Sequence, residues 1–112
     1  MSKPIRFALF AAALLTLAAC GQPVPNDKVA YVGEWQSPTM SLVIPQSGNV
    51  RYKRVKGSMT TSVDAPLRRF EGDNLVVGLP FASTTFEVTK PPFEEAGSWK
   101  MVVDGIELTR QR

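Results

Sequence analysis

Beyond residue 28, apolar and polar residues alternate with a period of two, in short runs separated by turn-forming residues. Such alternation places the apolar residues on one face, as in a strand with one buried side. Val50 and Tyr52, for example, face one way, and Arg51 and Lys53 face the other. No long run has the 3.6-residue period of a helix. Strands are expected at residues 30–36, 40–45, 50–56, 67–72, 75–79, 84–90, 99–103 and 106–110.

Turn signals separate these runs. Residues 46–49 and 71–74 combine glycine with polar residues, and Asp104-Gly105 between two alternating runs is a strong hairpin signal. Pro91 and Pro92 are expected to end the strand at 84–90, because proline cannot donate to a β-ladder. The pattern predicts an all-β domain of seven or eight short antiparallel strands. They form a meander closed into a small barrel or a compact β-sandwich, and we favour the barrel because closure hides edge strands.

The first nineteen residues have a different pattern. Lys3 and Arg6 precede an uncharged apolar run, residues 7–19, which ends in small residues before Cys20. This order is typical of a secretory signal peptide, and the run is shorter than the roughly 20 residues that span a bilayer. We therefore assign residues 1–19 to a signal segment, expected to be helical.

The stretch Leu17-Ala18-Ala19-Cys20 resembles the lipobox of bacterial lipoproteins. The resemblance implies cleavage between Ala19 and Cys20, and a diacylglyceryl group on the Cys20 thiol. Multiple acyl chains hold a protein stably in a membrane. Gly21 follows the cysteine where aspartate commonly retains such proteins at the inner membrane, so the resemblance implies a cell-envelope protein of the outer membrane. The alternative is an ordinary secreted protein with a cysteine near its cleavage site.

After the cut, residues 20–28 read as the lipidated cysteine and a proline-rich extended tether, and residues 29–112 as one small β domain. Loss of Lys3 and Arg6 lowers the formal net charge from +3 to +1. The basic character of the full chain is thus no argument for nucleic acid as a partner.

Gly33-Glu34-Trp35 on the first expected strand, together with Arg110 on the last, resembles the Gly-x-Trp and late arginine of lipocalins and related calycins. The resemblance implies that Arg110 packs across Trp35 and closes one end of a barrel, as a cation over an indole face. The alternative is a core tryptophan and a solvated arginine.

Candidate chemistry is sparse. The chain has no histidine and a single cysteine, which removes Ser-His-Asp and Cys-His catalysis and most zinc sites. The adjacent carboxylates Glu94 and Glu95 are expected to lie in a solvated loop. We expect no catalytic residue, no metal and no cofactor.

Three basic residues, Arg51, Lys53 and Arg68, would form a positive patch if their strands pair. Such a patch could meet an anionic envelope component by charge. The alternative is a solvated strand face whose cations protect a sheet edge.

The stretch Ser47 to Tyr52, SGNVRY, resembles the Ser-Gly-x-x-Tyr segment of lipoprotein lysozyme inhibitors, with the tyrosine one position late and without their paired cysteines. Three functions therefore stay open. The first is a non-enzymatic interaction module that docks through a strand face or through the proline loop at 90–97. The second is a lipocalin-like binder of a small apolar ligand, and the third is a lysozyme-inhibitor-like protein. The wall of an apolar cavity would comprise Trp35, Tyr52, Phe70, Phe86, Trp99 and Met101.

Overall fold

The computed structural model describes residues 22–112, and the expected signal segment with its Ala19–Cys20 cleavage site lies outside them. The described chain contains one short 3-10 helix and nine strands. Their bounds are η1 Asn26–Tyr31, β1 Gly33–Gln36, β2 Met40–Ile44, β3 Asn49–Lys56, β4 Met59–Glu71, β5 Asn74–Leu79, β6 Ala82–Phe86, β7 Val88–Glu95, β8 Ser98–Val103 and β9 Ile106–Arg110. Residues 22–112 contain no helix that is long and apolar enough to cross a bilayer.

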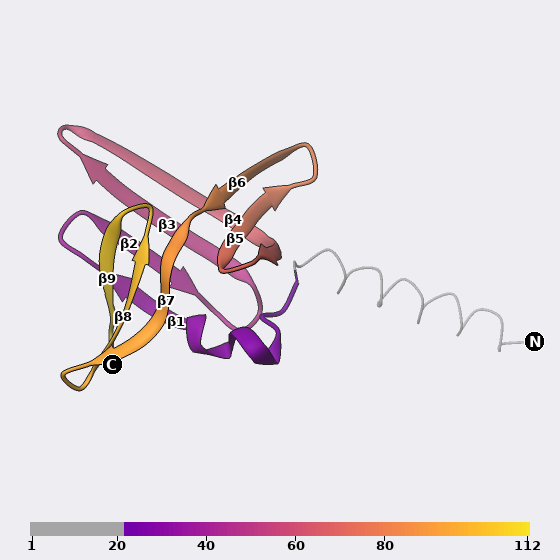
Figure 1. Ribbon diagram of the computed structural model, residues 1–112. Helices are drawn as coiled ribbons and strands as arrows, with labels where there is room; N and C mark the ends of the chain where they lie inside the picture. The colour runs from indigo at the N-terminus through magenta and orange to yellow at the C-terminus, as the bar shows by residue number, and fades with distance from the viewer. Residues whose placement is uncertain (1–21) are drawn as a thin grey trace, which may run out of the picture.

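The nine strands form one antiparallel sheet in the order β6-β5-β4-β3-β2-β1-β9-β8-β7. The sheet curls into a half-barrel (Figure 1). The predicted all-β class and antiparallel meander are confirmed, with nine strands in place of seven or eight. Of the two architectures expected, the single curled sheet is nearer to the barrel, but β6 and β7 stand at the two ends of the strand order, so the sheet is not closed.

The chain passes from one edge of the sheet to the other at Glu87. β6 and β7 are consecutive in sequence but occupy opposite ends of the strand order. The Glu87 N–H donates to Asp104 Oδ1 at 2.9 Å, and the Asp104 N–H donates to the Glu87 carbonyl at 2.8 Å. The Val88 N–H donates to Asn74 Oδ1 at 2.8 Å. The run at 84–90 is therefore two strands, and these bonds hold both sheet edges together at the junction.

The expectation that Pro91 and Pro92 end a strand is wrong. β7 continues through both prolines to Glu95, with register irregularities between Val88 and Lys90 and between Lys90 and Phe93. An edge strand tolerates proline where its N–H side faces away from the neighbouring strand or at a bulge. β7 lies at the edge of the sheet, so the missing N–H groups leave its pairing with β8 in place.

The longest strand, β4, includes residues 59–66, for which the sequence predicted no strand. These residues pair with β3 from Lys56↔Met59 to Asn49↔Pro66. The outer part of this hairpin extends past the curled sheet (Figure 1), and residues 59–62 are exposed. With no buried face there, the segment lacks the alternation that indicates a strand.

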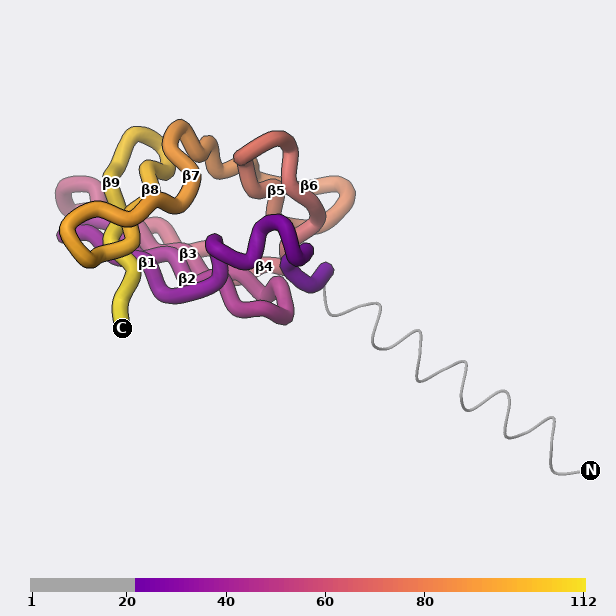
Figure 2. Tube along the Cα trace, turned by 60° about the horizontal axis from the view of Figure 1, so that its bottom comes forward, coloured from indigo at the N-terminus to yellow at the C-terminus, as the bar shows by residue number. Residues whose placement is uncertain are grey.

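The N-terminal segment lies against the sheet and differs from the extended tether that was expected. The Gln22 N–H donates to the Leu67 carbonyl at 3.1 Å, and the Val24 N–H donates to the Gln46 carbonyl at 3.0 Å. Val24 is 2% exposed and belongs to the core. The following turns form η1, which lies across one end of the half-barrel (Figure 2). Gln22 and Val24 are therefore attached to the sheet and do not belong to a free tether.

Inward-facing side chains fill the half-barrel. Trp35, Leu42, Ile44, Val50, Leu75, Val77, Met101, Val103 and Leu108 are all 0% exposed. Tyr52 and Phe86 pack with their ring centroids 4.8 Å apart. Burial of these apolar surfaces is the main stabilising term for a domain of this size.

Candidate functional site

Trp35 and Arg110, the pair expected to close one end of a barrel, lie side by side in the sheet. They are cross-strand neighbours, because β1 pairs with β9 in the register Trp35↔Arg110. The Trp35 indole is fully buried, and its Nε1–H donates to the Tyr31 carbonyl at 2.9 Å. The guanidinium carbon of Arg110 lies 5.8 Å from the Trp35 ring centroid and 5.2 Å from that of Trp99. The structure thus brings the expected pair together and adds Trp99 as a second aromatic partner.

Gly33 allows this close approach. A Cβ at Gly33 would lie 2.8 Å from Arg110 Cδ, and its φ of +148° is a conformation that residues with side chains rarely adopt. The position therefore requires glycine, because any larger residue would collide with the Arg110 side chain. Trp99 could have been found from sequence, because the Asp104-Gly105 turn fixes β8 beside β9.

The six aromatic and methionine residues expected to line a cavity fall into two groups, one in the core and one at its margin. Trp35, Tyr52, Phe86 and Met101 lie in the packed core. Phe70 and Trp99 pack at its margin, half-buried. The Phe70 ring meets Tyr31 edge-on at 5.0 Å between centroids. The four core residues therefore fill the interior with side chains and act as packing residues.

The predicted basic patch is split. Arg51 and Lys53 lie on the outer side of β3, in a groove shared with Glu34 and Val43. Arg51 is opposite Asp64 on β4. Arg68 lies four residues further along β4, about 13 Å at the usual rise of a strand, and lines a different hollow. Arg51 and Lys53 therefore face a groove of mixed charge, without Arg68.

The hollow that Arg68 lines lies between the N-terminal segment and β4 and has a volume of about 610 Å³. Its walls come from Gln22, Pro23, Pro25, Asp27, Lys28, Leu67, Arg68, Arg69, Phe70 and Gly72. The Lys28 ammonium lies 5.5 Å from the Phe70 ring centroid and 3.8 Å from Asp73 Oδ1. Cations here surround an apolar surface, an arrangement that sequence reasoning missed because it took residues 22–28 for a free tether.

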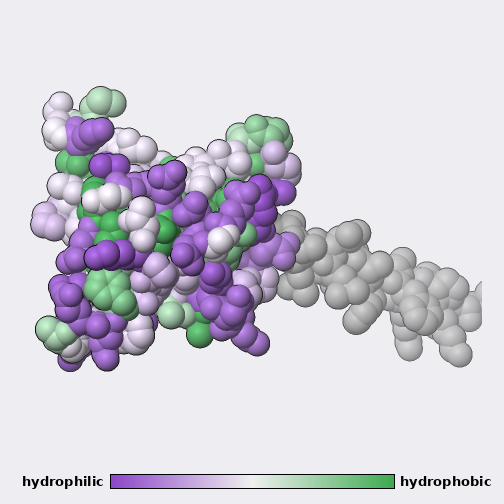
Figure 3. Space-filling model, viewed as in Figure 1, coloured by the Kyte–Doolittle hydropathy of each residue, from purple (hydrophilic) through white to green (hydrophobic). Residues whose placement is uncertain are grey.

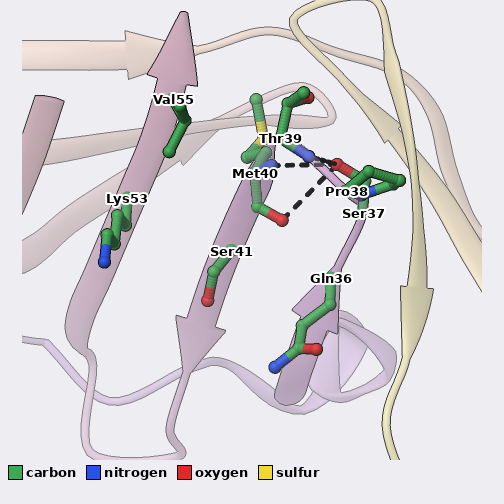
Figure 4. Close-up of a pocket in the computed structure, with 8 residues that line it drawn as sticks. All are labelled: Gln36, Ser37, Pro38, Thr39, Met40, Ser41, Lys53 and Val55. Carbon is green, nitrogen blue, oxygen red and sulfur yellow. Dashed lines mark hydrogen bonds between the residues drawn. The ribbon is translucent and has the colours of Figure 1, made fainter. Parts of the chain in front are cut away.

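A second hollow, of about 260 Å³, lies on the outer face beside the β1–β2 turn (Figure 4). The Ser37 hydroxyl accepts hydrogen bonds from the Met40 N–H at 2.9 Å and the Thr39 N–H at 3.2 Å. These bonds close the turn, in the way that serine commonly stabilises turns. The charged side chain among the residues that line this hollow is Lys53.

The paired carboxylates Glu94 and Glu95 lie at the end of β7 and not in a loop as expected, and both are exposed. Glu95 Oε1 accepts a hydrogen bond from Lys100 Nζ at 3.2 Å, and Lys100 Nζ lies 3.5 Å from Glu107 Oε1. The hydrogen bond to Glu95, with the charge of Glu107, raises the pKa of the Lys100 ammonium. Glu95 is thus part of a surface ion-pair cluster.

Residues 22–112 contain no group of three His, Cys, Asp or Glu side chains placed to hold a metal ion. In the stretch that resembles lysozyme inhibitors, Ser47 is exposed, Gly48 is buried and Tyr52 packs in the core. Tyr52 is therefore not displayed on the surface. Cys20 lies outside the described residues.

Exposed apolar residues gather at two hairpin tips. Phe81 is 85% exposed and Leu79 is 48% exposed at the β5–β6 tip, and Met59 is 71% exposed at the β3–β4 tip. Both tips lie at the top of Figure 1, with η1 at the bottom. Apolar side chains cover the upper right corner of the molecule, over the β5–β6 hairpin (Figure 3).

Comparison with known proteins gave no matching protein-family model, no similar curated protein and no similar solved structure.

Proposed function

We propose that this protein is a lipid-anchored lipoprotein of the bacterial cell envelope, whose β domain is a non-enzymatic interaction module. The anchor is supported by the Leu17-Ala18-Ala19-Cys20 stretch after an uncharged apolar run. Gly21 after the cysteine favours the outer membrane. No sequence feature supports an enzyme, since the chain lacks histidine and its one thiol is assigned to the lipid.

The interaction role is carried by the β5–β6 hairpin tip. Phe81 is 85% exposed on a two-residue turn, with Leu79 beside it. Aromatic side chains are enriched at protein interfaces, and most of the Phe81 surface is left uncovered by the domain itself. The partner is therefore expected to be an envelope protein with an apolar pocket for Phe81.

The anchor is tested by the intact mass and membrane fractionation of Cys20→Ser against Thr16→Ser, a conservative change in the same signal run. Wild type and Thr16→Ser are expected to carry the lipid mass and to sediment with outer membranes, and Cys20→Ser is expected to lack the lipid. Gly21→Asp is expected to shift the protein to the inner membrane. A Cys20→Ser protein that is processed and membrane-bound like wild type would refute the anchor.

The interaction role is tested in cells with a photo-reactive residue at Phe81, and with one at exposed Thr89 as the matched control. A discrete cross-linked product is expected from position 81 and not from position 89. Equal labelling at both positions, or none at position 81, would remove the β5–β6 tip as the docking surface.

A lipocalin-like binder of a small apolar ligand is the second candidate. It is favoured by the Gly33, Trp35 and Arg110 arrangement, and the filled core places it second. Native mass spectrometry of the purified protein separates the two candidates, because a binder would retain a mass of a few hundred daltons beyond its own lipid.

A further inference from the structure

The hollow between the N-terminal segment and β4 lies where the proposed anchor joins the domain. Gln22 lines this hollow and is fixed to it by its bond to the Leu67 carbonyl. Gly48 leaves room for the same segment, because a Cβ there would overlap the Gln22 carbonyl oxygen. Two residue steps from Gln22 to Cys20 span at most about 7 Å. With Cys20 lipidated as proposed, the hollow would lie at the level of the lipid headgroups, a layer about 5 to 7 Å deep.

A β-bulge places two arginines together at this hollow. Leu67 pairs with Val77 and Phe70 pairs with Leu75, and both partners are core residues. In a regular strand, one outward-facing residue separates two inward-facing residues. Here two residues, Arg68 and Arg69, separate inward-facing Leu67 from inward-facing Phe70. Bulges re-aim side chains in this way. Both arginines are consequently kept outside the core, and they line the hollow together with Leu67 and Phe70.

The charges at the rim leave donors free for an anion. Lys28, Arg68 and Arg69 line the hollow with a single carboxylate, Asp27. The neighbouring ion pairs are long, with Arg69 Nη2 3.7 Å from Glu71 Oε2 and Lys28 Nζ 3.8 Å from Asp73 Oδ1. Arg68 takes part in none of the ion pairs among residues 22–112. Arginine offers five N–H donors in a fork that matches phosphate oxygens.

We propose that this hollow binds the phosphate of a phospholipid headgroup in the leaflet that holds the Cys20 anchor, an inference that rests on the proposed lipidation. Arg68 and Arg69 donate to the phosphate oxygens, and Phe70 with the adjacent prolines contacts the glycerol and the first acyl carbons. The volume of about 610 Å³ is in the range of small-molecule sites. Binding would fix the orientation of the domain on the membrane, with the β5–β6 tip free to meet a partner.

The test is an NMR titration of the full-length protein, isolated from membranes into micelles of a neutral detergent. The probe is glycerophosphoglycerol, the water-soluble headgroup of phosphatidylglycerol, with inorganic phosphate as the parallel titrant. Saturable shifts are expected at the Arg68, Arg69 and Phe70 amides. Arg68→Gln with Arg69→Gln is expected to weaken binding about 30-fold, from the usual contribution of two basic residues near a membrane surface.

The matched control is Arg51→Gln with Lys53→Gln, which removes the same charge from another groove and is expected to change the affinity by less than about twofold. If both double variants weakened headgroup binding equally, the effect would come from the net charge of the protein, and the proposed site would be overturned. Inorganic phosphate binding as tightly as the headgroup would overturn its assignment to a lipid, and absence of saturable shifts would overturn both. The mass of the Cys20 adduct is measured separately, so failure of the anchor is distinguished from failure of the hollow.

Discussion

The guanidinium carbon of Arg110 lies 5.8 Å from the ring centroid of Trp35, its partner across the β1–β9 ladder. Trp99 lies 5.2 Å away on the other strand that flanks β9. One cation thus joins aromatic rings from β1 and β8 at the seam between the two halves of the sheet. Arg110 should contribute more to the stability of the fold than a fully exposed arginine, because one ring is buried and the other is partly buried.

Arg110→Ala is expected to lower the free energy of unfolding by about 1–2 kcal/mol, since it removes two cation–π contacts and the packing of the arginine stem. Urea denaturation followed by tryptophan fluorescence measures the change. Arg112→Ala is the control, because Arg112 is exposed and donates only to the Gly97 carbonyl among the hydrogen bonds of the described chain. An equal loss in both variants would show that the stacking adds nothing.

Gly33→Ala is expected to cost about 2–4 kcal/mol, because the new Cβ meets the Arg110 stem and the backbone is held at a φ of +148°. Gly57→Ala is the comparison. Its φ of +64° also disfavours alanine, but nothing lies within 4 Å of the added Cβ. It should cost about 1 kcal/mol. The double variant Gly33→Ala, Arg110→Ala should cost less than the sum of the single changes, and strict additivity would exclude the predicted clash.

Gly48→Ala is expected to displace the N-terminal segment, because its Cβ would overlap the Gln22 carbonyl oxygen. Hydrogen exchange provides the measurement. The Val24 amide, which donates to the Gln46 carbonyl at 3.0 Å, should lose protection by about tenfold or more, while core amides in β2 change less. Gly97→Ala is the control, since nothing lies within 4 Å of its added Cβ. Unchanged exchange at Val24 would show that the segment docks without Gly48.

Tyr31 provides a prediction at high pH. Burial, followed by the charge of Asp73, raises the pKa of the Tyr31 phenol to about 12. A pKa raised in the folded state stabilises the fold below the unfolded value of about 10, and this stability is lost as the pH rises through 12. Wild type should therefore lose stability between pH 10 and 12 more steeply than Tyr31→Phe. Thermal unfolding across this range, with ultraviolet titration of tyrosinate, tests the difference, and parallel curves for the two proteins would contradict it.

Sequence reasoning succeeded where one face of a strand is buried and failed where that condition does not hold. The Asp104-Gly105 turn and the alternation of Met101 and Val103 identify the β8–β9 hairpin, because turn chemistry and burial agree there. Residues 59–62 are exposed on both faces, so their strand leaves no periodic signal. The run at 84–90 alternates without interruption, and nothing local marks Glu87 as the point where the chain changes sheet edges.

The candidate sites divide in the same way. Trp35 and Arg110 could be paired from their places on the first and last strands. The hollow beside β4 could not be found, because it depends on a bulge that keeps both Arg68 and Arg69 outside the core and on a proline-rich segment that folds back. Val24 was the one apolar residue among polar residues and prolines that could have indicated docking.

The single seam between β1 and β9 also sets the order in which the domain can fold. Strands β1–β6 and β7–β9 pair between neighbours in sequence, whereas Trp35 and Arg110 meet across 75 positions with two registered pairs at the seam. Closing so long a loop costs entropy before any contact repays it, and such contacts slow folding. The two meanders should therefore form first and the seam last. Arg110→Ala should then accelerate unfolding and leave the folding rate nearly unchanged in stopped-flow measurements.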